Sequence, residues 1–303
     1  MSAKLQVRLG RLELANPVMT ASGTFGYGQE YAPFLDVDRL GAIVVKGLSL
    51  EPRAGNPPPR GVETPAGMLN CIGLENVGLK RFLAEKLPYL RGLKTKVVCN
   101  VLGGRVEDYV RLAGELAQAG GIAAVELNIS CPNVAAGGIC FGLEPRGVND
   151  LVARVRREVG EFPVIVKLSP EAPDLPSVCQ AAEDGGADAV SLINTIRAMA
   201  FDVYTGRPRL SSAIGGLSGP AIRPIAVRMV YECAQRVKLP LIGIGGIASW
   251  MDAAEFLLAG ASAVQIGTAN FVNPRVAADV LGGLTEWLSG HGHLIESRWS
   301  PRD

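Results

Sequence analysis

Residues 125–133 read Val125-Glu126-Leu127-Asn128-Ile129-Ser130-Cys131-Pro132-Asn133. The stretch begins as an apolar run and ends abruptly in asparagine, serine and cysteine, which is where a chain leaves a sheet. A thiol between two amides, followed by a proline that fixes the turn, is typical of a site that holds a small polar molecule beside a base. An ordinary strand with an Asx turn has the same local pattern, so the rest of the chain must distinguish the two.

Similar short apolar runs recur along the chain, and amphipathic stretches separate most of them. Continuous apolarity indicates strands of a parallel sheet that is covered on both faces. We predict eight such strands, at residues 17–22, 42–46, 96–101, 123–129, 163–168, 189–194, 241–245 and 263–267. Helical patterns include residues 106–119, 148–159, 221–237 and 251–259, and several of them stop at glycines.

Eight βα units in 303 residues predict a single-domain (β/α)8 TIM barrel that spans residues 1–303. An open doubly wound sheet is the alternative, because periodicity does not show whether a sheet closes. Two connections, from Gly47 to about Asn76 and from Thr195 to Gly219, are too long for plain βα loops. Both follow strand ends, so we expect long loop insertions at the C-terminal face, where the active sites of barrels lie.

Composition argues against several classes of protein. The net charge is +1 and no basic block interleaves with aromatics, which argues against nucleic acid as a partner. No apolar run reaches the roughly 18 residues of a membrane span, and no signal-peptide pattern is present. The six cysteines form no C-x-x-C pair, so no disulfide framework, zinc site or iron–sulfur cluster is predicted within this chain. We therefore expect a soluble, cytoplasmic protein that holds no metal.

Two lysines, Lys46 and Lys167, close apolar strands. Burying an ammonium group is costly unless an anion or several acceptors compensate, so the pattern favours an anionic ligand. A single lysine at such a position often reaches to solvent instead. Two at equivalent strand ends, on one face, favour the binding site.

Glycines end the last two predicted strands, as Gly245-Gly246 and Gly267-Thr268. Glycine lets backbone N–H groups approach an anion, and the last two βα loops of a barrel commonly bind phosphate. Residues 243–248 also match G-x-G-x-x-A, but this motif comes late, and the next strand does not end in an acidic residue. The pattern therefore favours a mononucleotide phosphate over NAD.

Together these features strongly resemble the dihydroorotate dehydrogenases, the FMN-containing barrels of pyrimidine biosynthesis. The resemblance covers nearly the whole chain. Its most specific segments are Ala21-Ser22-Gly23-Thr24-Phe25-Gly26, Gly55-Asn56-Pro57, Asn70-Cys71-Ile72-Gly73-Leu74-Glu75-Asn76, residues 128–133, Gly215-Gly216-Leu217-Ser218-Gly219-Pro220 and Gln265-Ile266-Gly267-Thr268-Ala269-Asn270-Phe271.

The resemblance implies that Cys131 is the catalytic base, which removes the C5 proton of dihydroorotate while the C6 hydride passes to FMN. A serine at this position marks a membrane-associated class, so the cysteine indicates a soluble one. Substrate contacts are implied for Lys46, Asn70, Cys71, Ile72, Gly73, Leu74, Asn128, Asn133, Asn194 and Thr195. Contacts with FMN are implied for Ala21, Ser22, Lys46, Gly47, Asn100, Asn128, Lys167, Ile193, Gly219, Gly245, Gly246, Gly267 and Thr268.

Within the family, residues 66–70 and 217–231 are most similar to the NAD-linked type. In that type a homodimer of FMN barrels binds a second subunit that carries FAD and a [2Fe–2S] cluster, giving a heterotetramer. A fumarate-linked homodimer and a dihydropyrimidine dehydrogenase are the alternatives among flavoenzymes. A non-redox aldolase or isomerase barrel is the alternative outside them. Arg197 replaces an expected apolar residue, and a solvated arginine is the simplest interpretation.

Overall fold

The computed structural model describes residues 5–129 and 142–296, and its centre is a closed barrel of eight parallel strands. The last strand pairs with the first, so the sheet has no free edge. This confirms the predicted TIM barrel and contradicts the open sheet. In chain order the strands are β3 (Val18–Thr20), β4 (Ala42–Leu48), β7 (Lys96–Val101), β8 (Ala124–Asn128), β9 (Val164–Lys167), β10 (Ala189–Leu192), β15 (Leu241–Ile244) and β16 (Ala263–Ile266).

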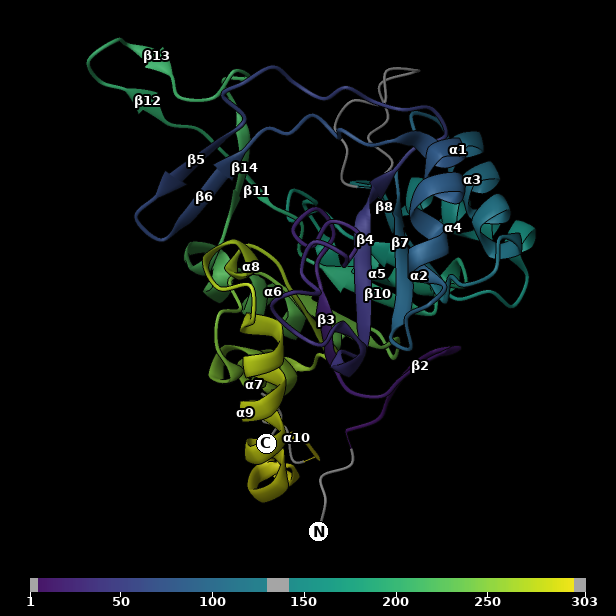
Figure 1. Ribbon diagram of the computed structural model, residues 1–303. Helices are drawn as coiled ribbons and strands as arrows, with labels where there is room; N and C mark the ends of the chain where they lie inside the picture. The colour runs from purple at the N-terminus through teal and green to yellow at the C-terminus, as the bar shows by residue number, and fades with distance from the viewer. Residues whose placement is uncertain (1–4, 130–141, 297–303) are drawn as a thin grey trace.

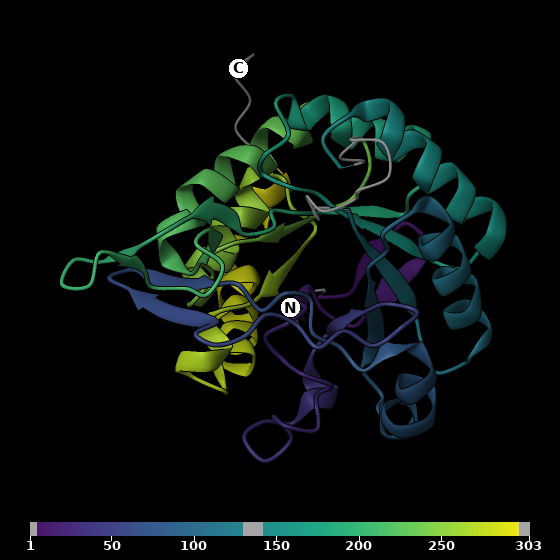
Figure 2. The same ribbon diagram turned by 90° about the horizontal axis from the view of Figure 1, so that it is seen from above.

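Helices form a ring around the barrel, as the view from above shows (Figure 2). The helix predicted at 148–159 begins earlier, because Pro145 occupies a first-turn position that does not need its missing N–H. The one predicted at 221–237 is shorter at both ends, since a 3-10 turn precedes it and it ends at Ala234. The long helices are α3 (Val106–Gln118), α4 (Pro145–Val159), α5 (Leu175–Asp184), α6 (Arg223–Ala234), α7 (Trp250–Ala259) and α9 (Val276–His291). Shorter segments are η1 (Val37–Arg39), α1 (Gly78–Arg81), η2 (Phe82–Lys86), α2 (Leu87–Leu90), η3 (Pro220–Ile222), α8 (Ala269–Val272) and α10 (His293–Glu296).

The apolar core has two main parts, because each barrel strand buries both faces. One part fills the space between strands and helices and includes Val125 and Leu127. The other fills the lower barrel, where Met19, Val98 and Ile165 meet. The hairpin of β1 (Val7–Leu9) and β2 (Leu12–Leu14) adds three buried leucines to this inner part.

The two long connections pair with each other at the open end of the barrel. The first contains β5 (Gly61–Thr64) and β6 (Gly67–Asn70), and the second contains β11 (Ile196–Ala198) and β14 (Gly215–Ser218). They form one antiparallel sheet in the order β11-β14-β6-β5 (Figure 1). The hairpin of β12 (Phe201–Asp202) and β13 (Arg207–Pro208) projects beyond it. The predicted insertions at the C-terminal face are confirmed, but they contain paired strands where the sequence predicted only loops.

Membrane insertion through a helix has no support in residues 5–129 and 142–296, where none of the helices has the length and apolarity that a bilayer span requires.

Candidate active site

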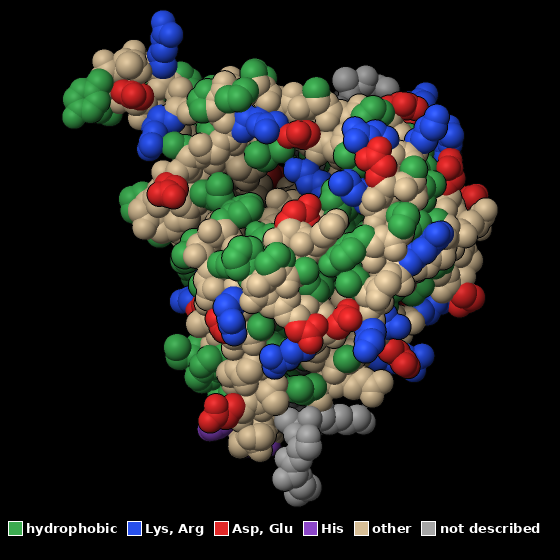
Figure 3. All heavy atoms as spheres, viewed as in Figure 1, with side chains coloured by type: hydrophobic (Ala, Val, Ile, Leu, Met, Phe, Trp, Pro, Cys, Tyr) green, Lys and Arg blue, Asp and Glu red, His purple; other side chains and the backbone are tan. Residues whose placement is uncertain are grey.

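A cavity of about 960 Å³ opens where the barrel strands meet the four-stranded sheet. The space-filling view shows a hollow below the projecting strands, with Lys and Arg side chains at its edge (Figure 3). All eight barrel strands contribute to its wall, through residues at or just after their carboxyl ends. The volume is at the upper end of the range for sites that enclose a drug-sized ligand, so a nucleotide and a small second ring fit together.

The predicted site residues converge on this cavity. Cys131 and Asn133 lie outside the described residues. All the others line the cavity wall: Ala21, Ser22, Lys46, Gly47, Asn70, Cys71, Ile72, Gly73, Leu74, Asn100, Asn128, Lys167, Ile193, Asn194, Thr195, Gly219, Gly245, Gly246, Gly267 and Thr268. Their common location is a finding, whereas their individual contacts with ligands remain predictions.

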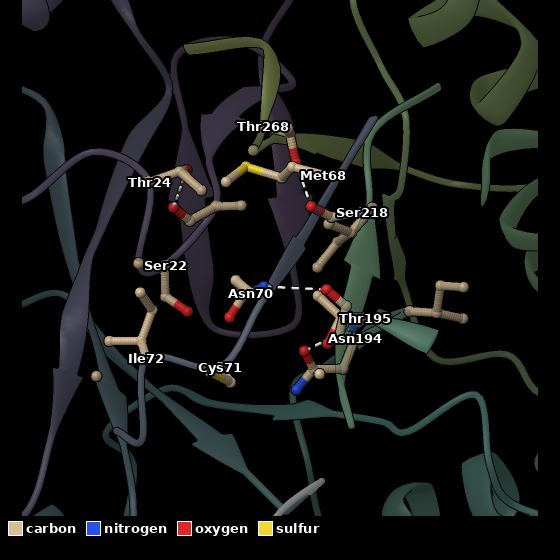
Figure 4. A pocket seen from close by; sticks show the side chains of 18 of the residues that line it. Ser22, Thr24, Met68, Asn70, Cys71, Ile72, Asn194, Thr195, Ser218 and Thr268 are labelled. Atoms are coloured by element: carbon tan, nitrogen blue, oxygen red, sulfur yellow. Dashed lines mark hydrogen bonds between the residues drawn. The ribbon is translucent and has the colours of Figure 1, made fainter. Parts of the chain in front are cut away.

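Three asparagine amides form a polar group on the wall. The Nδ2 of Asn194 donates to Oδ1 of Asn128 at 3.3 Å, and the backbone N–H of Thr195 donates to Oδ1 of Asn194 at 2.8 Å. Asn70, at the end of β6, donates its Nδ2 to the carbonyl of Gly216 at 3.3 Å. In the close view Asn70 lies centrally, with Asn194 and Thr195 to one side (Figure 4). Amides both donate and accept, which suits the edge of a planar heterocycle.

Lys46 brings a half-buried cation to the same cavity. The register between β4 and β7 shifts between Val45 and Leu48, so the strand is irregular where Lys46 and Gly47 reach the cavity. Burial lowers the pKa of Lys46, and the nearby carboxylate of Glu75 only partly offsets that effect. Desolvation thus disfavours the charged form, and a bound anion would restore it. Lys46 is therefore suited to a carboxylate ligand.

The floor of the cavity is a buried polar layer. Lys167 is 5% exposed, and its Nζ lies 3.9 Å from Oε1 of Glu126. Asn100 is 1% exposed, and its Nδ2 donates to the same carboxylate at 2.7 Å. Within the described residues, Oδ1 of Asn100 has no hydrogen-bond partner. Buried polar atoms nearly always have a hydrogen-bond partner, so this acceptor on the cavity wall is suited to a hydrogen bond from a ligand.

Glycines shape the opposite end of the cavity. Gly246 has φ +72°, and a Cβ there would lie 2.8 Å from the carbonyl oxygen of Gly219, which itself has φ +94°. The loops after β14 and β15 therefore approach each other so closely that only glycine fits. Gly267 and Thr268 follow β16 beside them, and Thr268 Oγ1 donates to Ser218 Oγ at 2.7 Å. These groups form the glycine-rich end that a phosphate requires.

The loop at residues 71–74 is held by a residue that the sequence analysis did not place in the site. Asn56 donates its Nδ2 to the carbonyl of Cys71 at 2.9 Å and its backbone N–H to that of Ile72 at 3.0 Å. The thiol of Cys71 belongs to a small apolar cluster with Leu69 and Leu210, so its side chain is held by the protein itself. In the sequence, the segment Gly55-Asn56-Pro57, which is shared with the dihydroorotate dehydrogenases, could have indicated that Asn56 belongs to the site.

Further residues of the cavity wall carried no separate signal in the sequence. They include Arg53, Ser169 and Glu171. Thr24, Met68 and Ser218 also line the cavity, and they lie in segments that carried the resemblance to the family. Arg197 is exposed on β11 at the cavity, and its backbone N–H donates to Glu171 at 3.3 Å. This exposure agrees with the interpretation of Arg197 as a solvated arginine.

Comparisons with known proteins agree with this geometry. The family model described as dihydroorotate dehydrogenase matches residues 4–288. The chain belongs to the dihydroorotate dehydrogenase family. It is 53% identical over 292 residues, covering 96% of each chain, to the "dihydroorotate dehydrogenase B (NAD(+)), catalytic subunit" of Pelobacter propionicus. Proteins of the same name from Bacteroides fragilis and Thermoanaerobacter pseudethanolicus are 50% and 51% identical, over 96% and 94% of this chain and 95% and 93% of their own.

Membership of the dihydroorotate dehydrogenase family confirms the resemblance that the sequence motifs indicated. It favours a dehydrogenase over a non-redox aldolase or isomerase barrel. The relatives cited are also named as the NAD-linked type, the type that residues 66–70 and 217–231 indicated.

Proposed function

We propose that this chain is the catalytic subunit of an NAD-linked dihydroorotate dehydrogenase, which oxidises (S)-dihydroorotate to orotate in pyrimidine biosynthesis. One observation carries the proposal: a half-buried cation, Lys46, shares a cavity with the amides of Asn70, Asn128 and Asn194. Dihydroorotate combines a carboxylate with a ring of alternating N–H and C=O groups. The cavity supplies a partner for each.

FMN fits the rest of the cavity on three grounds. The unpaired Oδ1 of Asn100 matches the imide N–H of the flavin ring. Lys167 places a cation near the floor, where the negative charge of a reduced flavin would be stabilised. The glycine-rich end formed by Gly219, Gly246 and their neighbours matches the phosphate. When bound, FMN supplies the acceptor for the hydride from C6 of the substrate.

The protein residues then bind, orient and deprotonate the substrate. Asn70, Asn128, Asn133 and Asn194, with Thr195, hold the ring, and Lys46 binds the carboxylate. The backbone of Ile72, Gly73 and Leu74 completes the pocket, and Cys71 shapes this loop from behind. Cys131 removes the C5 proton as a thiolate. Because a free thiol with a pKa near 8.5 is mostly protonated at neutral pH, activity should rise with pH unless the site lowers that value.

Ala21, Ser22, Gly47 and Ile193 complete the proposed flavin site, with Gly245, Gly267 and Thr268 at its phosphate end.

A partner subunit follows from the same proposal. The relatives' names contain both "NAD(+)" and "catalytic subunit", which supports a second chain that passes electrons to NAD. We propose that FAD and a [2Fe–2S] cluster belong to that chain, in a cytoplasmic heterotetramer built on a homodimer of this one. Val203 and Tyr204, at the tip of the β12–β13 hairpin, are 83% and 97% exposed, which supports contact with another chain.

The alternatives within flavoenzymes fit less well. A fumarate-linked homodimer would not need an NAD-linked partner, whereas the cited relatives are named as NAD-linked catalytic subunits. A dihydropyrimidine dehydrogenase acts on uracil or thymine, which have no carboxylate, so it would leave Lys46 without its ligand.

The deciding experiment is anaerobic stopped-flow spectroscopy of the purified yellow protein, in the visible absorbance band of its flavin. Dihydroorotate should bleach the band rapidly, and dihydrouracil should leave it unchanged. Bleaching by dihydrouracil alone would support the dihydropyrimidine alternative, and no bleaching by either would remove the pyrimidine assignment. Turnover with NAD only after addition of the partner subunit, and none with fumarate, would support the NAD-linked type.

A further inference from the structure

Glu126 is a charged side chain in the middle of the barrel, and it is fully buried. It lies on β8 between Val125 and Leu127, which face the helices, whereas Ala124 belongs to the apolar cluster inside the barrel. Alternation along the strand therefore points Glu126 inward, one layer above that cluster and directly below the cavity. Burying a carboxylate costs free energy unless its oxygens accept hydrogen bonds or pair with cations. The partners of Glu126 therefore indicate what it does in the protein.

Four neighbouring side chains supply those partners, each from a different strand. Oε1 accepts a hydrogen bond from Nδ2 of Asn100 at 2.7 Å and lies 3.9 Å from Nζ of Lys167. Oε2 accepts from Oγ of Ser191 at 2.9 Å and from Nε2 of Gln265 at 2.7 Å. Glu126 thus ties β7, β9, β10 and β16 together across the interior.

A carboxylate can only accept hydrogen bonds, and this fixes how the neighbouring amide is turned. Asn100 must direct its nitrogen at Glu126, so its oxygen faces the other way. That oxygen lies beside Gly47, where a Cβ would be 2.9 Å from it, and Gly47 lines the cavity. The oxygen has no hydrogen-bond partner among the described residues. It is held ready to accept one from a ligand in the cavity.

We propose that Glu126 is a positioning residue for the flavin, acting through Asn100 and Lys167. It turns the oxygen of Asn100 toward the cavity, where it would accept from the imide N–H of the ring, and it places a carboxylate 3.9 Å from the buried ammonium of Lys167 on the cavity floor. Its own negative charge also moderates the field of Lys167, which sets how strongly the site favours the reduced flavin. This inference rests on the proposed binding of FMN.

The test uses Glu126→Gln, which retains the shape and removes the charge. Apoprotein is titrated with FMN, and the midpoint potential of the bound flavin is measured by redox titration. We expect the Kd for FMN to rise about tenfold or more, the loss of about one well-formed hydrogen bond. The potential should become more positive, because an anion near the flavin has been removed. A purely structural role would lower thermal stability without this shift in potential.

Two further variants separate geometry from charge. Glu126→Asp keeps the charge on a shorter side chain, so FMN affinity should fall while the potential stays close to that of the wild type. It also serves as the test if the glutamine variant does not fold. In an Asn100→Ala background, Glu126→Gln should change the Kd for FMN by less than about twofold, because the two substitutions remove the same contact.

Asp188→Asn is the matched control. Asp188 is another buried carboxylate, 2% exposed, but it binds Arg11 and Arg156 away from the cavity. Its substitution should lower thermal stability and leave the Kd and the potential unaltered. An unchanged Kd and potential in Glu126→Gln would overturn the inference, as would a full effect in the Asn100→Ala background. A wild-type protein that does not bind FMN would instead refute the proposed function.

Discussion

The side-chain amide of Asn194 donates to the side-chain oxygen of Asn128 at 3.3 Å, and this bond joins the ends of two strands that are not neighbours in the barrel. β9 lies between β8 and β10, so the bond passes across its carboxyl end. Since Asn194 also accepts from the backbone N–H of Thr195, its amide is held in one orientation before any ligand arrives. Such preorganisation reduces the entropy that a ligand must overcome on binding.

Substitution of Asn194 tests the amide group. Asn194→Ala should raise the Kd for orotate and the KM for dihydroorotate about tenfold to a hundredfold, which corresponds to the loss of one or two hydrogen bonds. Orotate binding is followed by the perturbation of the flavin spectrum. Asn149→Ala is the control, because Asn149 donates to a carbonyl at the same distance of 3.3 Å but between α4 and α5. Equal effects of both substitutions would contradict the assignment of Asn194.

Lys46 should couple ligand binding to pH. Burial lowers its pKa from 10.5, so the unfolded chain keeps this proton to a higher pH than the folded one. Stability therefore rises with pH between the lowered value and 10.5, and the buried charge destabilises the ligand-free protein at lower pH. Lys46→Met should raise the melting temperature of the ligand-free protein at neutral pH and flatten this rise.

The same substitution should weaken orotate binding about tenfold or more, because it removes a charged partner of the carboxylate. In the wild type, orotate affinity should fall as pH rises through the lowered pKa of Lys46, and this dependence should disappear in the variant. Titrations across the alkaline range measure both effects. An orotate Kd that is equal in the two proteins at neutral pH would exclude Lys46 as the carboxylate site.

Two glycine substitutions should have opposite results. Gly246→Ala places a Cβ 2.8 Å from the carbonyl oxygen of Gly219 at a φ of +72°, so the protein should purify with little FMN and should bind added FMN weakly. Gly282→Ala lies on the exposed face of α9 with no atom near the new Cβ, and should stabilise the protein by about 0.5–1 kcal/mol. Flavin content and urea unfolding distinguish the two, and normal flavin content in Gly246→Ala would refute the phosphate site.

The role proposed for Cys131 rests on the resemblance to the family, because the residue lies outside the described residues. Cys131→Ala should reduce flavin bleaching by dihydroorotate about 10²–10⁴-fold, the usual contribution of a general base, while the protein stays yellow. Orotate should still perturb the flavin spectrum, because binding does not require the base. Loss of flavin together with activity would assign Cys131 a structural role.

Asp188 should matter for stability alone. Its carboxylate accepts from Arg11 at 2.8 Å, from Arg156 at 2.5 Å and from the backbone N–H of Val164 at 2.8 Å. Asp188→Ala should destabilise the protein by about 3–5 kcal/mol, because buried donors lose their anion. Glu85→Ala, which breaks an exposed pair with Arg81, should leave the stability almost unchanged. Denaturant unfolding of both variants checks the contrast.

The strands and their polar ends were predictable because a parallel barrel imposes a simple pattern. Strands covered on both faces are continuously apolar, and their carboxyl ends all reach one rim. Lys46, Asn100, Asn128 and Lys167 could therefore be placed in one site from their positions at strand ends. The pairing of the two long insertions was not predictable, because Leu69 and Leu217 meet across 148 residues of chain with no local signal.

The sequence by itself determined the alternation of strands and helices, the gathering of polar residues at the strand ends and the chemistry available there, since these depend on short-range patterns of apolar and polar residues. Only the tertiary structure decided which groups touch. Asn56 became part of the site through its bonds to the loop of Cys71 and Ile72. Glu126 meets Asn100 on the neighbouring strand β7, but only the closed barrel brings Gln265 of β16 to it. The contact with Gln265 depends on barrel closure, because β8 and β16 are not neighbours in the sheet and meet only across the interior of the barrel.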